Sequence, residues 1–200
     1  MRRIANLIAG KWTAPQDGKY FDDHNPATGE KIAEIPSSTA ADIKTAVAGA
    51  QMAQPEWGAL PVEERAVWLD SIASALEARS DEIAELESRD TGKPVALARA
   101  VDAARSALNF RFFAELVREL PDELYKMKDA LNVVVRKPVG VAGLITPWNL
   151  PLYLLSWKVA PAILMGNCVV CKPSRLTPLT ANLLAEVVTE AGLPPGVVNI

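Results

Sequence analysis

The stretch that decides the fold runs from Gly140 to Pro178 and reads GVAGLITPWNLPLYLLSWKVAPAILMGNCVVCKPSRLTP. Val139 to Ile145 is an apolar run bounded by glycine and proline, which predicts a buried parallel strand. Leu152 to Leu164 is compatible with a helix and is apolar on nearly all sides. Cys168 to Cys171 predicts a second short buried strand. The order of strand, helix and strand indicates an α/β sheet with parallel strands.

Two polar turns close these predicted strands. Thr146-Pro147-Trp148-Asn149 follows the first strand, and Lys172-Pro173-Ser174 follows the second and leads into a helix at about Pro178. Asn149 and Lys172 therefore fall at the carboxyl ends of two neighbouring parallel strands. Because open α/β sheets bind their ligands at that edge, we expect a ligand site there.

Composition limits the classes of function. The chain has 200 residues, enough for one large domain or most of two, and half of them are apolar. The net charge is −3 and the cations are scattered, which argues against nucleic acid or an anionic membrane as a partner. The most apolar window, Leu150 to Met165, contains Lys158 and is shorter than the ~20 residues of a membrane span. The apolar stretch before Lys11 is too short for a signal peptide, so we expect a soluble, cytoplasmic protein.

The part of the chain before this stretch predicts short strands and then four helices. Residues 1–36 alternate and carry turn signals, with the hairpin turn N-P-A-T-G-E at Asn25–Glu30. The first predicted helix is capped by Ser38 or Thr39, with Asp42 near the cap, and ends at Ala53; the second has Pro61 at its first position. The third is capped by Ser80 and covers Asp81 to Arg89. The fourth runs from Val95 to about Leu120. After a polar stretch from Pro121 to Ala130, the β-branched run Leu131 to Val135 predicts another strand.

Several motifs resemble those of the aldehyde dehydrogenase superfamily. They are P-W-N-x-P at Pro147–Pro151, G-N-x-V-V-x-K-P-S at Gly166–Ser174, G-x-P-x-G-V-x-N-(I/V) at Gly192–Ile200, I-x-G-x-W at Ile8–Trp12, N-P-A-T-G-E at Asn25–Glu30 and T-G-K-P at Thr91–Pro94. The whole chain resembles the N-terminal portion of a family member. It is most similar to the subgroup that oxidises 2-aminomuconate and 2-hydroxymuconate semialdehydes.

The resemblance implies an α/β fold that is aldehyde dehydrogenase-like, with an N-terminal β/helical segment leading into an incomplete Rossmann-like parallel sheet. It divides the chain into N-terminal β segments that form an arm (1–36), the helical part of the cofactor-binding domain (37–120), a linker with an oligomerisation-type strand (121–138), and the first βαβαβ part of the NAD(P)-binding domain (139–200). In the family the arm joins subunits, so a homo-oligomer is expected for the complete enzyme. An ordinary sheet edge is the alternative for the apolar run Val133 to Val135, although an unpaired edge of this kind promotes aggregation.

The resemblance also implies roles for residues at the two turns. In the family, the asparagine of P-W-N donates to the oxyanion formed when a cysteine thiolate adds to an aldehyde, which makes Asn149 the predicted catalytic residue. A neutral amide at a rigid turn supplies such a donor without charge reorganisation, whereas an ordinary turn asparagine is the alternative. The family's lysine bonds to the adenosine ribose of the nicotinamide cofactor, which implies this role for Lys172. The other cofactor-binding residues implied are Ile145, Thr146, Pro147, Trp148 and Ser174.

Arg175 departs from the family pattern. The family commonly has glutamate after K-P-S, and its carboxylate accepts from the ribose hydroxyls of NAD. An acidic residue favours NAD, whereas an arginine can accommodate the 2′-phosphate of NADP. We therefore expect Arg175 at the cofactor, where it either shifts the preference toward NADP or weakens nucleotide binding. The expected cofactor is NAD or NADP.

Arg111 is the predicted substrate-binding residue. It stands in Asn109–Ala114, N-F-R-F-F-A, among three phenylalanines, which is an unusual setting for a solvated arginine. Its fork of donors matches a carboxylate, and in the muconate-type subgroup a similar stretch presents arginine to the distal carboxylate of the substrate. The partner is then a small aldehyde that carries a carboxylate. The alternative is a snorkelling arginine whose stem packs on apolar surface.

The remaining reactive side chains carry no predicted chemistry. Cys168 and Cys171 lie in a strand-like apolar run, so we expect inert buried thiols rather than a redox pair. No metal is expected, because His24 is the only histidine and a zinc site needs further ligands. Carboxylates such as Glu85 and Glu87 are interpreted as solvated helix faces.

The cysteine nucleophile in G-Q-x-C and the glutamate base in E-L-G-G-K, which the family's mechanism requires, do not occur in these 200 residues. The catalytic domain is therefore expected to lie outside this chain, which alone should be inactive. Three hypotheses remain open: the N-terminal portion of an NAD(P)-dependent semialdehyde dehydrogenase, a non-catalytic remnant or nucleotide-binding or oligomerisation module, and one half of a split enzyme.

Overall fold

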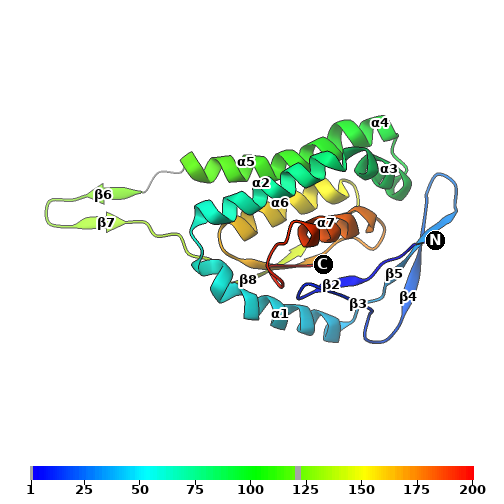
Figure 1. Cartoon of the computed structure of the whole chain (residues 1–200), viewed down its shortest axis with the longest axis horizontal. Coiled ribbons are helices and arrows are strands. Elements are labelled where there is room, and N and C mark those ends of the chain that lie inside the picture. The colour runs from blue at the N-terminus through cyan, green and yellow to red at the C-terminus, as the bar shows by residue number, and fades with distance from the viewer. Residues whose placement is uncertain (1, 120–122) are drawn as a thin grey trace.

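The computed structural model describes residues 2–119 and 123–200. Its centre is a parallel sheet in the order β10-β9-β8, formed by Val198–Asn199, Cys168–Lys172 and Val141–Ile145. Helices α6 (Pro151–Leu164) and α7 (Leu179–Glu190) lie on one face of the sheet, and α1 (Ala40–Ala59) lies on the other (Figure 1). The expected α/β fold with a parallel sheet is confirmed.

The two strands predicted around the polar turns are present, but they differ in burial. β8 pairs in parallel with β9, from Val141 opposite Cys168 to Ile145 opposite Lys172. β9 is central, and its first four residues are buried. β8 is an edge strand in the described part of the sheet and is not buried as predicted, since Ile145 is 67% exposed.

Helix α1 shows the predicted N-terminal cap and a different end. The hydroxyl of Thr39 accepts from the backbone N–H of Ala41 (3.2 Å), and the carboxylate of Asp42 accepts from the N–H of Thr39 (2.7 Å). The helix continues to Ala59, past the predicted end at Ala53, and contains Pro55. A proline inside a helix removes one N–H donor and its ring crowds the carbonyl four residues earlier, so Pro55 weakens the last turns of this helix.

The next helices are α2 (Val62–Ala78), α3 (Ser80–Thr91), α4 (Val95–Ala98) and α5 (Ala104–Glu119), with a π-helical turn at Arg99–Ala103. Three details of the prediction are wrong. Pro61 precedes α2 as its cap, Ser80 is the first helical residue of α3 and makes no side-chain cap, and the long fourth helix is interrupted by the π turn. Leu120, its predicted end, lies outside the described residues.

Helix α2 is held to the neighbouring helices by packing and by one buried arginine. Leu69, Ile72 and Leu76 of α2 are fully buried, as the apolar stripe of an amphipathic helix predicts. Nε of Arg65 donates to the carbonyl of Leu164 at the end of α6 (2.6 Å). The last carbonyls of a helix have no partner within it, so this contact joins α2 to α6.

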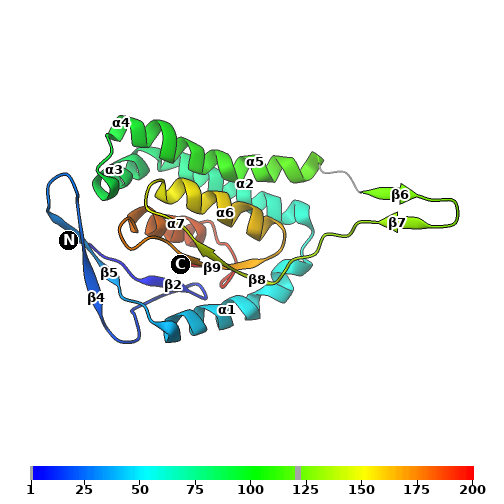
Figure 2. The ribbon, with the colours of Figure 1, turned by 180° about the vertical axis from the view of Figure 1, so that it is seen from behind.

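The N-terminal strands lie beside the central sheet (Figures 1 and 2). They are β1 (Arg2–Arg3), β2 (Asn6–Ile8), β3 (Lys11–Thr13), β4 (Tyr20–His24) and β5 (Lys31–Pro36). The turn between β4 and β5 is closed by Asn25 N–H donating to the carbonyl of Glu30 (2.9 Å), as the hairpin motif predicts. Leu7 and Ile200 exchange backbone hydrogen bonds of 2.9 and 3.0 Å, which connect β2 to the chain just after β10.

A hairpin of β6 (Leu124–Lys126) and β7 (Leu131–Val133) projects away from the rest of the molecule (Figures 1 and 2). β7 is shorter than the predicted strand over 131–135. The stretch predicted to be only a polar linker contains β6, because Leu124 and Tyr125 pair with Val133 and Asn132. Pro121 lies outside the described residues. Large apolar side chains on this hairpin are exposed: Leu124, Tyr125, Met127, Leu131, Val133, Val134 and Val135.

Within the described residues, the helices are all too short or too polar to span a membrane.

Candidate functional site

The two polar turns meet at the carboxyl edge of the sheet. The backbone N–H of Thr146, just after β8, donates to the carbonyl of Lys172 at the end of β9 (3.3 Å). Asn149 follows in the same turn and is exposed, and α6 begins at Pro151. The side chain of Asn149 therefore lies between a strand end and a helix start, where the backbone on both sides is fixed by regular structure.

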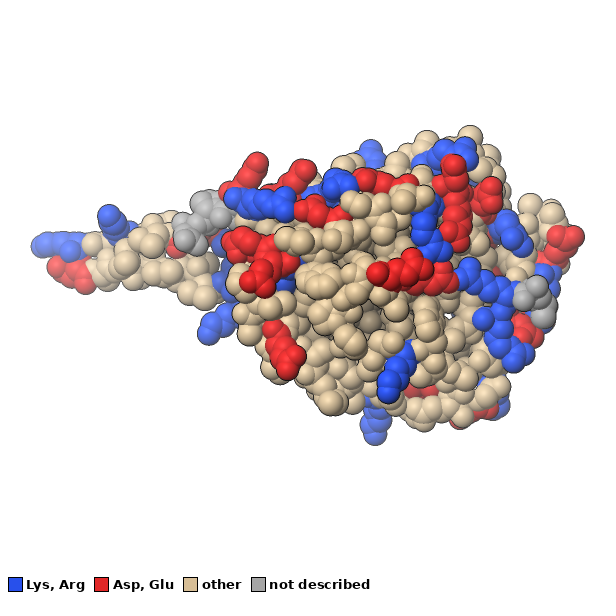
Figure 3. Space-filling view, in the orientation of Figure 1, with Lys and Arg blue, Asp and Glu red and all other residues tan. Residues whose placement is uncertain are grey.

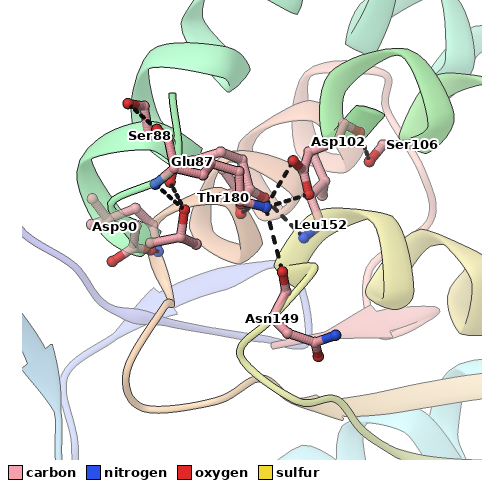
Figure 4. A network of polar contacts seen from close by, with 11 residues as sticks. Glu87, Ser88, Asp90, Asp102, Ser106, Asn149, Leu152 and Thr180 are labelled. Atoms are coloured by element: carbon pink, nitrogen blue, oxygen red, sulfur yellow. Dashed lines mark hydrogen bonds and ion pairs between the residues drawn. The ribbon is translucent and has the colours of Figure 1, made fainter. Parts of the chain in front are cut away.

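A buried polar network lies beneath this turn (Figure 4). Oε1 of Glu87 accepts from the backbone N–H of Leu152 (3.0 Å) and from the hydroxyl of Thr180 (2.8 Å). Nζ of Lys93 donates to both carboxylate oxygens of Asp102 (2.9 and 2.8 Å). These contacts join α3, the loop after it, the π turn, α6 and α7 around the P-W-N turn.

This network was not predicted from the sequence. The interpretation of Glu87 as part of a solvated face is wrong, because its side chain is fully buried. Their spacing in the sequence indicates burial, because Glu87 and Asp90 follow the buried Ile83 by four and seven residues and so lie on the same face of α3. Asp102, on the π turn, is also fully buried, and its Oδ2 lies 2.8 Å from Nζ of Lys93.

Burial changes the proton affinity of these carboxyls. Removal from water raises the pKa of Glu87 to about 7, and the nearby carboxylate of Asp102 adds to this effect. Burial, followed by the adjacent carboxyl of Asp23, raises the pKa of Asp90. Asp90 is held in place by the backbone N–H of Leu179, which donates to its Oδ2 (2.9 Å).

A cavity of about 490 Å³ opens beside the end of β9, and its lining includes Lys172, Ser174 and Arg175. This volume lies in the range of cofactor pockets. Lys172 and Arg175 are exposed cations, which suits an anionic dinucleotide. Ser174 is partly committed to the turn, since its hydroxyl accepts from the N–H of Leu176 (3.2 Å).

The other predicted cofactor residues lie at the neighbouring strand end and do not line this cavity. Ile145 and Trp148 are 67% and 60% exposed, and Thr146 is buried. Pro147 lies between them and is exposed. Lys158 of α6, which was not predicted as a site residue, donates from Nζ to the carbonyl of Ile145 (2.5 Å) and so lies against the same turn.

Arg111 projects from α5 toward α2. Its guanidinium binds the carboxylate of Glu77 through two hydrogen bonds (2.9 and 2.7 Å) and the hydroxyl of Ser74 (3.1 Å). Figure 3 shows acidic and basic side chains interleaved along these upper helices, where Arg118 also pairs with Asp70. The predicted substrate arginine thus belongs to a surface ion-pair network and not to the cavity beside β9.

The two cysteines are buried, and burial raises the pKa of the Cys168 thiol to about 11 and that of Cys171 to about 12. Both are therefore protonated at neutral pH, as expected of inert thiols. In the part of the chain that the structure describes, no cluster of three or more His, Cys, Asp or Glu side chains could hold a metal ion.

A parallel sheet with polar turns and a cavity at its carboxyl edge is the architecture of a Rossmann-like α/β unit. The profile of the aldehyde dehydrogenase family matches residues 12–200, and the chain belongs to that family.

Relatives and solved structures agree with this assignment. The chain is 46% identical over 199 residues to 2-aminomuconic semialdehyde dehydrogenase of Danio rerio, a match that covers 98% of this chain and 40% of that protein. It is 44% identical over 206 residues to 2-hydroxymuconic semialdehyde dehydrogenase of Pseudomonas sp. (strain CF600), covering 100% and 42%. A P. syringae indole-3-acetaldehyde dehydrogenase, solved with NAD+ and IAA, superimposes with a TM-score of 0.94 at 38% identity, covering 98% and 40%. The chain thus spans about two fifths of the length of these proteins.

Proposed function

We propose that this chain is the N-terminal portion of an NAD(P)-dependent semialdehyde dehydrogenase, which oxidises an aldehyde to a carboxylate through a thiohemiacetal on a cysteine outside these 200 residues. The observation that carries the proposal is the meeting of two strand ends through the Thr146–Lys172 hydrogen bond. An exposed amide, Asn149, lies in the turn just beyond the end of β8, and an exposed cation, Lys172, lies at the end of β9.

The chemical task of Asn149 is to stabilise negative charge. When the thiolate adds to the aldehyde, the carbonyl oxygen becomes an oxyanion, and the Nδ2–H of Asn149 donates to it. A preorganised neutral donor lowers the barrier because little reorganisation is needed at the moment of reaction. The cofactor, when bound, supplies the hydride acceptor for the oxidation.

The cofactor is held by the cavity beside β9 in this proposal. Lys172 bonds to the adenosine ribose, and Ser174 keeps the turn closed through Leu176. Arg175 offers donors and no acceptor, so it fits a 2′-phosphate better than the free ribose hydroxyls of NAD. The proposed cofactor is therefore NAD or NADP, with Arg175 as the residue that decides between them.

The proposed substrate is a carboxylated aldehyde oriented by Arg111, and the proposed assembly is a homo-oligomer. Arg111 is 34% exposed at its side chain, so a ligand can reach the guanidinium beside Glu77. The apolar side chains of the β6–β7 hairpin are exposed in the isolated chain. Pairing of this hairpin with another subunit would bury them.

The test is an assay of aldehyde oxidation by the polypeptide that joins this chain to a cysteine-bearing remainder, or by the two parts together. Asn149→Ala should lower kcat by about 10²- to 10³-fold, the effect of removing one oxyanion donor. The matched control is Gln51→Ala, which removes an exposed side-chain amide on α1 and should leave kcat unchanged. Undiminished kcat in Asn149→Ala, or no aldehyde oxidation by the unaltered protein, would overturn the proposal.

A further inference from the structure

We propose that Lys93 is a positioning residue for Asn149, acting with Asp102 and Glu87 to clamp the P-W-N turn from below. This inference rests on the proposed function of Asn149. The three side chains come from α3, the loop after it and the π turn, and all three are well removed from solvent, with side-chain exposures of 13% for Lys93 and 0% for the two acids.

The first contact of the clamp lies at Asn149 itself. Nζ of Lys93 donates to the backbone carbonyl of Asn149 in a long hydrogen bond of 3.4 Å, across 56 positions of sequence. Figure 4 shows the side-chain amide of Asn149 pointing away from this network. The contact thus restrains the backbone and leaves the Nδ2–H donor free for a ligand.

The second contact lies three residues later. Oε1 of Glu87 accepts from the backbone N–H of Leu152, one of the first N–H groups of α6, which lack partners within the helix. A carboxylate at this place also suits the positive end of the helix dipole. Asn149 is therefore held on both sides, through its own carbonyl and through the helix that follows.

Charge balance explains why the clamp needs a lysine. Asp102 and Glu87 are both buried, and Lys93 lies 2.8 Å from the former and 3.9 Å from the latter. Buried carboxylates require a partner cation or a proton. Lys93 provides the cation, and its ammonium group also donates to the carbonyl of Asn149. A hydrophobic residue at this position would do neither.

A set of matched variants separates positioning from folding. Lys93→Met leaves two buried acids without their cation and can fail to fold, so the double variant Lys93→Met/Asp102→Asn is the informative one. Lys93→Arg retains the charge and tests rescue. Lys44→Met, at an exposed position on α1, is the control for loss of a lysine.

The first measurement uses the 200-residue chain. Hydrogen exchange at Leu152 should become at least about tenfold faster in the double variant, and the order parameter of the Asn149 side-chain amide should fall. The amides of Val169 and Val170 in β9 should keep their protection. Unchanged exchange and order at Leu152 and Asn149 would overturn the clamp, whether or not the protein proves to be a dehydrogenase.

The second measurement uses the complete enzyme. The double variant should lose between about 10- and 100-fold in kcat, a range expected from small misplacement of a reacting group, with KM for the cofactor unchanged. Lys93→Arg should recover part of the loss, and Lys44→Met should show none. Full kcat in a folded double variant would show that the network has only a structural role. A wild-type enzyme without aldehyde oxidation would refute the proposed function. The hydrogen-exchange result would then decide by itself whether Lys93 restrains the turn.

Discussion

Glu77 holds Arg111 with both of its carboxylate oxygens, at 2.9 Å from Nε and 2.7 Å from Nη2. The ion pair lowers the pKa of Glu77 through these hydrogen bonds. The bidentate geometry that would recognise a substrate carboxylate is therefore already satisfied within the protein. A substrate must share or displace Glu77 to reach Arg111, which makes Glu77 a competitor for the proposed specificity residue.

The first prediction concerns this competition. In the complete enzyme, Arg111→Ala should lower kcat/KM by about 30-fold for a carboxylated aldehyde and little for a simple one, because a charged hydrogen bond is worth about 2 kcal/mol. Glu77→Gln should raise kcat/KM for the carboxylated aldehyde only. Equal losses on both aldehydes in Arg111→Ala would limit the arginine to a structural ion pair.

The second prediction concerns the cofactor. Arg175→Glu should shift the ratio of Kd values toward NAD by tenfold or more, because a carboxylate accepts from the ribose hydroxyls and repels a 2′-phosphate. Titration of the chain with NAD+ and with NADP+ measures this ratio. Lys128→Glu on the hairpin makes the same change of charge away from the cavity and should leave the ratio as it was. A ratio that does not move in Arg175→Glu would place Arg175 outside the cofactor site.

Local sequence was sufficient to predict the strands and helices that carry the site. The apolar runs before Thr146 and Lys172 each end at a turn that contains proline. These turn residues are enough to predict where β8 and β9 end and which polar residues follow them. The cap of α1 was also predictable, because Thr39 and Asp42 have the spacing of a capping box.

Contacts between distant segments could not be predicted in this way. Glu85 and Glu87 look alike in sequence, yet one is exposed and the other is buried, because only tertiary packing places Glu87 beneath α6. The partner of Arg111 was missed for the same reason, since Glu77 lies 34 positions earlier on another helix. The π turn was not predicted, because a single extra residue hardly alters the apolar pattern of a long helix.

The third prediction concerns assembly. If the β6–β7 hairpin joins subunits, Val133→Lys should lower the mass of the complete protein measured by light scattering, because a buried lysine without a partner weakens an interface. Val133 is 55% exposed in the isolated chain. Val67→Lys, at a 60% exposed position on α2, is the matched control and should leave the mass unchanged. The same mass for the Val133→Lys variant would exclude the hairpin as the essential contact.

The last prediction is a pH dependence of stability caused by Glu87. Its pKa in the folded chain is raised from 4.5 to about 7, so the folded state holds a proton that the unfolded state has released between these values. The free energy of unfolding must then fall as pH rises through this window, by up to about 3 kcal/mol, with the full loss present above pH 7. Asp90, whose pKa is also raised, acts in the same direction, so only a difference between variants isolates Glu87.

Glu87→Gln provides that difference, because glutamine keeps an acceptor for Leu152 and Thr180 but has no proton to release. Urea unfolding at intervals from pH 5 to pH 8 should show wild-type stability falling relative to this variant as pH rises. Glu85→Gln changes an exposed carboxyl two residues away. The stability of this variant should depend on pH in the same way as that of the wild type. If the Glu87→Gln curve is also parallel, the carboxyl of Glu87 is ionised throughout this range, and Lys93 then neutralises it fully.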